Sequence, residues 1–221
     1  MVQQQVFFQA VSFSDKLFLQ AEDLACARGA RDVFSSLNFR VNAGDALAVY
    51  GTNGSGKTSL LRMIAGFLAP RAGSLSFSGE PDEQAEPASY CHYLGHADGL
   101  KANLTVSETV DFSARNFGQL DTMIDLSVLG LAGHGDQMVG DLSAGQKRRL
   151  MLARLLIAPR PIWLLDEPLT ALDTQGRDLI ETLAGYNLQC GGLILAASHE
   201  ALNFATHQLT LKRNHHAMVA L

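Results

Sequence analysis

The order of apolar and polar positions along the chain predicts a mixed α/β fold. Two early segments alternate with a period of two, as strands with one buried face do: residues 17–25 and 33–41. Three later segments are apolar without interruption, which is typical of parallel strands covered on both faces: residues 46–50, 162–165 and 193–197. Helical spacing separates these later runs. We therefore predict a mostly parallel sheet core with an N-terminal antiparallel β layer.

The middle of the chain has helical patterns and no strand pattern. Thr105 and Glu108 have the spacing of a capping box, which opens a helix. A second helix is expected over residues 120–129, and a longer one over 143–158. We therefore predict a helical subdomain at about residues 97–158, inserted into the α/β core.

Shorter elements and the two ends complete the prediction. Further strands are expected at residues 74–77, 90–94 and 208–211, and further helices over 59–67, 175–186 and 199–204. Residues 1–16 match no pattern and form an extension of unknown role. Residues 212–221 are expected to be a tail, so the main domain covers residues 17–211.

Composition and charge narrow the classes of function. The chain has 221 residues, of which 47% are hydrophobic and 18% are charged, as in an ordinary globular domain. The formal net charge is -5 and no basic block occurs, so nucleic acid is not an expected partner. No stretch approaches the about 20 apolar residues that span a bilayer, and the start lacks the basic region of a signal peptide. If the protein acts at a membrane, other chains must cross it.

The three cysteines, at positions 26, 91 and 190, lie far apart and form no C-x-x-C pair. This pattern is typical of reduced, mostly buried thiols in a cytosolic protein. Cys91 and His92 are adjacent, so they belong either to a metal site or to a strand. Because no further ligands follow at metal-site spacing, the strand is favoured.

A glycine-rich loop after residues 46–50 carries the first candidate chemistry. It fits G-x-x-x-x-G-K-[ST] in the order strand, loop, helix that a phosphate-binding loop requires. The expected ATP contacts are Gly51, Thr52, Asn53, Gly54, Ser55, Gly56, Lys57, Thr58 and Ser59. The glycines let backbone N–H groups face phosphate oxygens, Lys57 reaches the β- and γ-phosphates, and Thr58 binds Mg²⁺. The alternative is a chance glycine loop.

Two acidic residues follow the apolar run at 162–165. The carboxyl end of a parallel strand faces the ligand crevice of an α/β sheet. Asp166 is therefore expected to hold Mg²⁺ through water, and Glu167 to act as general base on the attacking water. The alternative is a surface strand end with two acids, which the neighbouring phosphate-binding loop disfavours.

The segment Leu142–Gln146 supports two compatible interpretations. Ser143 and Gln146 have capping-box spacing, so the segment is expected to begin a helix. Ser143, Gly145 and Gln146 at that helix N-terminus also form a candidate second anion site. A second site is useful if it completes the nucleotide pocket of another copy.

Taken in order, these motifs resemble those of ABC-type ATPases, which are P-loop NTPases. Leu142–Gln146 resembles the family signature, with Ala144 where glycine is commonest, and residues 171–173 resemble the D-loop. His199 resembles the switch histidine that contacts the γ-phosphate, although a lone histidine at a strand end is usually structural. The resemblance covers roughly residues 18–211. It implies ATP and Mg²⁺ as cofactors, a second ATPase copy that sandwiches ATP, and catalysis by Glu167, His199 and Lys57.

Two positions depart from the family pattern. The Q-loop glutamine of the family is expected where this chain has His96, and an imidazole can also accept a hydrogen bond from a metal-bound water. His96 is therefore a candidate at the Mg²⁺ site. The aromatic residue that stacks on adenine is expected near residues 26–28, where none occurs. Arg28 is a candidate to stack through its planar guanidinium, and the alternative is an exposed turn arginine.

The same departures resemble one group in the family, the ATP-binding subunits of haem exporters that serve cytochrome c assembly. The resemblance is carried by residues 22–26, 31–34, 93–101 and 104–106. It implies integral membrane transporter subunits as partners and a peripheral place on the cytoplasmic face of the bacterial inner membrane. It also implies that haem is met only indirectly, through those partners. His215 and His216 are accordingly assigned to a solvated tail rather than to haem binding.

Three alternative functions stay open at this point. An exporter of a lipid or a drug would carry the same ATPase motifs, because the membrane subunits contact the cargo. A soluble ABC-type ATPase acting on ribosomes or DNA would usually have two ATPase halves or a long coiled-coil insertion. A P-loop kinase would need an arginine-bearing lid and would not require Leu142–Gln146.

Overall fold

The computed structural model describes residues 11–29, 31–78, 87–95, 99–119, 124–212 and 218–220. The chain divides into two compact units. The core unit consists of Ser12–Leu94, Arg160–Pro168 and the chain from Ala184 on, and the helical unit is built on Gly95–Pro159 and Leu169–Leu183. The range predicted for the helical subdomain, residues 97–158, lies within the first segment of the helical unit.

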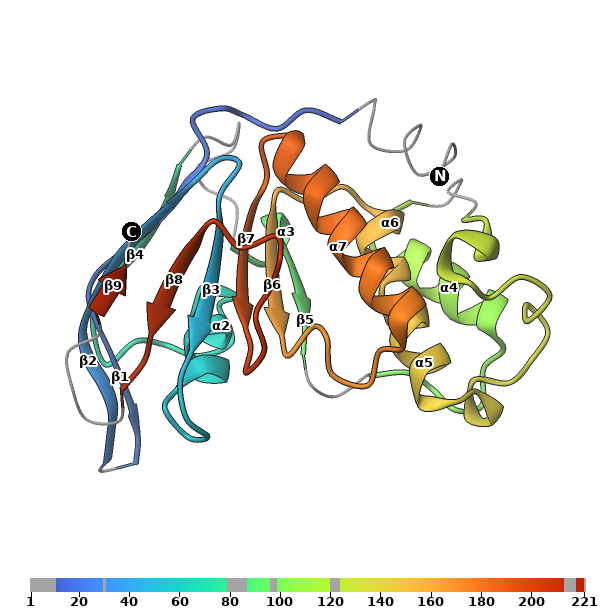
Figure 1. Ribbon diagram of the computed structural model, residues 1–221, viewed down its shortest axis with the longest axis horizontal. Coiled ribbons are helices and arrows are strands. Elements are labelled where there is room, and N and C mark those ends of the chain that lie inside the picture. The colour runs from blue at the N-terminus through green and yellow to red at the C-terminus, as the bar shows by residue number, and fades with distance from the viewer. Residues whose placement is uncertain are drawn as a thin grey trace. The chain divides into compact units, whose positions relative to one another are not determined.

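A six-stranded sheet forms the centre of the core unit, in the order β5-β6-β7-β3-β8-β9 (Figure 1). Its strands are β3 Ala46–Tyr50, β5 Cys91–Leu94, β6 Ile162–Asp166, β7 Leu193–Ala197, β8 His207–Thr210 and β9 Met218–Ala220. The first five in the sheet order are parallel, and β9 pairs antiparallel with β8. Every residue of β6 and β7 is buried, so the uninterrupted apolar runs are central strands, as predicted.

A three-stranded antiparallel sheet forms the second layer of the core unit, in the order β2-β1-β4. It consists of β1 Phe18–Arg28, β2 Arg31–Asn42 and β4 Ala72–Ser78. Buried side chains of β1 and β2, such as Leu19 and Leu37, join one apolar cluster with helix α2 (Lys57–Ile64) and the parallel strands. The two sheets therefore share one core, and the predicted N-terminal antiparallel layer is confirmed. The short helix α3, Pro87–Tyr90, precedes β5.

The helical unit contains no long helix of its own among the residues described. Its elements are α4 Val106–Asn116, η1 Leu126–Leu129, η2 Val139–Asp141, α5 Ala144–Met151 and α6 Ala153–Ile157. Helix α7, Thr174–Gln189, begins in this unit and ends in the core unit. The predicted capping box at the start of α4 is confirmed: the Thr105 N–H donates to Glu108 Oε2 (2.8 Å) and the Glu108 N–H donates to Thr105 Oγ1 (3.1 Å).

Two helix predictions in the helical unit were wrong. The helix expected over residues 120–129 is, in its described part, only the 3₁₀ turn η1, because Asp125 Oδ1 takes the Ser127 N–H and starts a tighter turn. The helix expected over residues 143–158 is two helices. At the break, the N–H groups of Leu152 and Leu155 bond three residues back instead of four.

Two predictions near the C-terminus were also wrong. Residues 199–204 form no helix, because Ser198 Oγ accepts from the Glu200 N–H (3.0 Å) and donates to the Glu200 carbonyl (2.8 Å). Such local bonds occupy backbone groups that a helix would use. The strand expected at 208–211 is β8, but it is not the last one, because β9 lies in the segment predicted as a tail.

Candidate active site

The glycine-rich loop connects β3 to α2 (Figure 1). It needs its glycines for steric reasons. Gly51, Gly54 and Gly56 have φ values of 152°, 79° and 106°, which residues with a Cβ rarely adopt. A Cβ on Gly51 would lie 2.4 Å from Ser55 Oγ, and one on Gly56 would lie 2.6 Å from Val33 Cγ1. The loop is therefore a closely wound backbone cradle, as a phosphate site requires.

Ser55 supports the assignment of this cradle to an anion. Its side chain is fully buried, and its Oγ has no hydrogen-bond partner in the part of the chain that the structure describes. A buried hydroxyl without a partner is costly, and a phosphate oxygen would satisfy it. The loop thus has the space, the N–H groups and an unused polar atom for a phosphate group.

Three charged or titratable side chains meet beside the loop. Lys57 Nζ donates to the Gly51 carbonyl at 2.8 Å and lies 3.1 Å from His199 Nε2. His199 Nε2 in turn lies 3.3 Å from Glu167 Oε1. Parallel pairing of β6 with β7 explains this meeting, because it sets Asp166 beside Ala197 and brings both strand ends to one edge.

Glu167 holds an unusual backbone conformation. Its φ is 54°, in the left-handed region that favours glycine, and its N–H donates to the Ala197 carbonyl at 2.9 Å. A non-glycine residue in this region costs of the order of 1 kcal/mol or more, and such strain is concentrated at functional sites. The strained turn presents the carboxylate to His199 while the backbone stays tied to β7.

A second pair provides oxygen ligands suited to Mg²⁺. Thr58 Oγ1 donates to Asp166 Oδ1 at 3.2 Å, and Asp166 is buried at the end of β6. A hydroxyl and a carboxylate at this spacing fit a hard divalent cation that keeps several of its waters. Burial raises the pKa of the nearby Tyr93 phenol, and the Asp166 carboxylate raises it further while Arg62 opposes the change.

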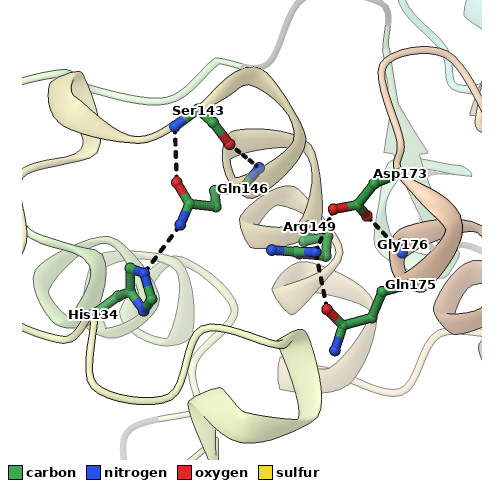
Figure 2. Close-up of polar contacts among 7 residues, drawn as sticks. All are labelled: His134, Ser143, Gln146, Arg149, Asp173, Gln175 and Gly176. Carbon is green, nitrogen blue, oxygen red and sulfur yellow. Dashed lines mark hydrogen bonds and ion pairs between the residues drawn. The ribbon is translucent and has the colours of Figure 1, made fainter.

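The signature-like segment begins α5 in the helical unit (Figure 2). The Ser143 N–H donates to Gln146 Oε1 at 2.8 Å and the Gln146 N–H donates to Ser143 Oγ at 3.2 Å, so the predicted capping box is confirmed. Ser143 and Ala144 are exposed, and Gly145 is partly buried. The N-terminus of α5 is therefore open to an anion approaching from solvent.

The D-loop-like residues are tied to α5 by an arginine that sequence reasoning missed. Arg149 is buried, and its guanidinium donates to Asp173 Oδ2 at 2.7 Å and to Gln175 Oε1 at 3.1 Å (Figure 2). Asp173 also accepts the Gly176 N–H at 2.9 Å and so caps α7. No local pattern could have revealed the pair, because 24 positions separate its members.

Arg28 and His96, the two departures from the family pattern, have different outcomes. Arg28 ends β1, and its guanidinium donates to the Oγ of the buried Ser59 at 3.2 Å, so its orientation is partly fixed. Stacking of Arg28 on adenine stays a prediction. His96 lies outside the described residues.

Two of the three cysteines are core residues. Cys26 and Cys91 are buried free thiols, and Cys190 is partly buried. Cys91 and His92 lie in β5, which agrees with the strand interpretation, and the described residues contain no cluster of three metal-ligating side chains. Burial raises the pKa of the Cys91 thiol to about 12, which keeps it protonated and unreactive.

A phosphate-binding loop beside an Asp-Glu strand end and a histidine, on a parallel sheet, defines a P-loop ATPase. The chain belongs to the ABC transporter family, whose model matches residues 34–170. That range includes the glycine-rich loop, Leu142–Gln146 and the Asp166-Glu167 pair, but not His199. The ATPase domain of this family binds ATP.

Relatives narrow the place of the chain within the family. It is 46% identical over 88% of its length to the cytochrome c biogenesis ATP-binding export protein CcmA of Rhodopseudomonas palustris, covering 98% of that protein. It is 48% identical over 87% of its length to the protein of the same name from Bradyrhizobium diazoefficiens, covering 97% of it.

Solved structures agree on the fold. The chain is similar to an ATP-binding subunit of an ABC transporter, with a TM-score of 0.74 and 22% identity, over 88% of this chain and 85% of the other. A putative ABC transporter ATP-binding protein from Pyrococcus furiosus gives a TM-score of 0.73 at the same identity, over 88% of this chain and 97% of the other. In the parts of the chain that are described, no helix is both long and apolar enough to cross a membrane.

Proposed function

We propose that this chain is the ATP-hydrolysing subunit of an ABC exporter that serves cytochrome c biogenesis by supporting haem export or delivery. The observation that carries the proposal is 46–48% identity, over 87–88% of this chain, to relatives named as cytochrome c biogenesis ATP-binding export proteins. The alternatives of a lipid or drug exporter, a soluble ABC ATPase and a P-loop kinase have no comparable support.

The side chains of the core unit divide the work of ATP hydrolysis. Lys57 exchanges its bond to the Gly51 carbonyl for the β- and γ-phosphates, and residues 51–59 wrap the phosphates with their N–H groups. Thr58 and Asp166 would hold Mg²⁺, which would neutralise part of the phosphate charge. His96 would serve the Mg²⁺ site in place of the family glutamine, and Arg28 would stack on adenine.

Glu167 and His199 act on the bond that breaks. Glu167 orients the attacking water and accepts its proton as general base. His199, now 3.3 Å from the carboxylate, contacts the γ-phosphate, so the charge that develops there is met by the Lys57 ammonium and by His199. The 3.1 Å spacing of Lys57 from His199 lets one phosphate group contact both.

A second copy of the chain completes the site. Ser143, Gly145 and Gln146, at the exposed N-terminus of α5, contact the γ-phosphate of the ATP held by the other copy. Closing and opening of this ATP sandwich moves integral membrane subunits, which handle the haem. The chain itself meets haem only indirectly, and lies peripherally on the cytoplasmic face of the bacterial inner membrane.

Replacement of Glu167 tests this function in the host. A strain lacking the gene is given wild type, Glu167→Gln, or Glu22→Gln, an exposed carboxylate on β1, as the matched control. We expect haem-stained c-type cytochromes with wild type and the control, and none with Glu167→Gln. The purified Glu167→Gln chain should bind ATP yet turn over more than about 100-fold more slowly. Normal c-type cytochromes in the deletion strain would contradict the proposal.

A further inference from the structure

His134 touches the signature segment from outside the known ATPase motifs. It lies in the loop between η1 and η2 and is partly buried. Its Nε2 lies 3.0 Å from Gln146 Nε2, on the side of the amide opposite Ser143 (Figure 2). Its Nδ1 lies 2.9 Å from the Ala132 carbonyl oxygen. The side chain of Gln146 is thus held at both ends, by Ser143 and by His134.

The two ends of this chain of hydrogen bonds have fixed polarity. At one end the Ser143 N–H can only donate, so the atom of Gln146 that faces it at 2.8 Å must be the amide oxygen. The amide nitrogen therefore faces His134, and because it can only donate, His134 Nε2 must accept. At the other end the Ala132 carbonyl can only accept, so His134 Nδ1 carries the proton.

One protonation state satisfies every bond in this series. Neutral His134 with its proton on Nδ1 matches both partners, whereas the other neutral tautomer mismatches both. A protonated imidazole would point an N–H at the Gln146 NH₂ group, which is also a donor. Turning the Gln146 amide does not help, because its nitrogen would then face the Ser143 N–H and break the capping box.

We propose that neutral His134 is a positioning residue for ATP hydrolysis, which fixes Gln146 and through it the Ser143 end of α5 that contacts the partner copy's ATP. The inference rests on the proposed function. It adds an acid-sensitive element, because protonation of His134 releases the Gln146 amide and loosens the segment. Imidazole is the side chain that normally changes charge between pH 5 and 8.

Among the described residues, no charged side chain on the elements around His134 forms a hydrogen bond or ion pair with its ring. Asp136, on the same loop, is exposed. On α5, Lys147 Nζ donates to the Gly140 carbonyl at 3.0 Å. At the start of α4, Glu108 accepts the Thr105 N–H. Within the described residues, the recorded polar partners of the ring are Ala132 and Gln146, so its charge state acts on the amide of Gln146 directly.

Nitrogen NMR tests the geometry independently of any activity. The imidazole ¹⁵N shifts of the full chain at pH 8, with the His134→Gln variant to assign the signals, should show His134 with its proton on Nδ1. A proton on Nε2, or rapid exchange between both tautomers as in a free imidazole, would overturn the proposal.

ATP hydrolysis tests the consequence, with two variants that separate loss of the contact from loss of titration. His134→Ala removes the acceptor, and we expect a kcat about fivefold below wild type at pH 8, the effect of one hydrogen bond, with ATP affinity of the monomer unchanged. His134→Gln places an amide oxygen near the former Nε2 and does not titrate. It should match wild type at pH 8 and exceed it increasingly as the pH falls to 5.5, towards a limit of about fivefold.

The rate ratios isolate His134 from other titrating groups, since those groups are shared by all variants. The matched control is His207→Gln, the same substitution at a histidine that pairs with Asp45 in the core unit and should not change the pH profile. Ratios that stay constant from pH 8 to 5.5 would overturn the acid-sensitive positioning role. A wild type without ATP hydrolysis at any pH would instead refute the proposed function, and the NMR result would still decide the geometry.

Discussion

Glu167 combines the acid that we assign as general base with a backbone that resists any side chain. Its φ of 54° and its bond to the Ala197 carbonyl fix it in a conformation that glycine adopts without cost. Glu167 is therefore a site of trade-off between stability and activity: its carboxylate is needed for chemistry, but its Cβ strains the turn.

This trade-off predicts which of two inactive variants is the more stable. Glu167→Ala and Glu167→Gly both remove the carboxylate, so both should lose more than about 100-fold in turnover. Glu167→Gly should nevertheless be more stable than Glu167→Ala, because only alanine keeps the backbone strain. The difference in the free energy of unfolding should be about 1 kcal/mol, so the glycine variant should unfold at a higher temperature. Thermal denaturation with ATP absent measures the difference. Equal stabilities would show that the turn is relaxed.

Cys91 gives a prediction about alkaline pH. Burial raises the pKa of its thiol from 9.0 to about 12, above the value in the unfolded chain. The stability that this site contributes is therefore complete below pH 9 and is lost as the pH rises from 9 towards 12, by up to about 1.4 kcal/mol per unit. Urea unfolding of Cys91→Ala should lose less stability between pH 8 and 10.5 than wild type. Cys190→Ala, at a less buried thiol, should show a smaller difference, and identical slopes for all three would contradict the assignment.

For helices and strands, the predictions succeeded where the sequence pattern lies within a few neighbouring residues. The capping boxes at Thr105–Glu108 and Ser143–Gln146 were both found, because each needs only a side chain and a backbone group three residues apart. The apolar runs of β6 and β7 were found because that composition is typical of strands buried on both faces.

Predictions failed where a single side chain redirects the backbone or where contacts are distant. Asp125 and Ser198 each bond a backbone N–H two residues on, and turns replace the helices expected there. Arg149 and His134 were missed for a different reason, since their partners lie on other segments and carry no pattern at fixed spacing. The candidate site was thus predictable from its motifs, and its supporting contacts were not.

At the scale of the whole molecule, the residues proposed for one ATP site belong to both compact units. Lys57, Asp166, Glu167 and His199 lie in the core unit, and Ser143 lies in the helical unit. In the proposed sandwich, each site takes its core residues from one copy and Ser143 from the other. A chain with a defective core residue and a chain with a defective Ser143 should therefore form one intact ATP site when they pair.

Mixing two inactive variants tests this sharing. Lys57→Ala removes the ammonium that holds the phosphates, and Ser143→Asp keeps an N-cap for α5 while setting a negative charge against the partner's γ-phosphate. Each variant alone should be nearly inactive, because both of its sites carry a defect. In a mixed dimer, one site has both defects and the other has none. An equal mixture in which the two sites act independently should therefore recover about a quarter of wild-type turnover, since half of the dimers are mixed and each has one intact site.

A double variant carrying both changes on one chain, mixed with Lys57→Ala, should recover nothing, because every site then lacks Lys57. Activity of the first mixture no higher than that of its components would contradict a site shared between copies.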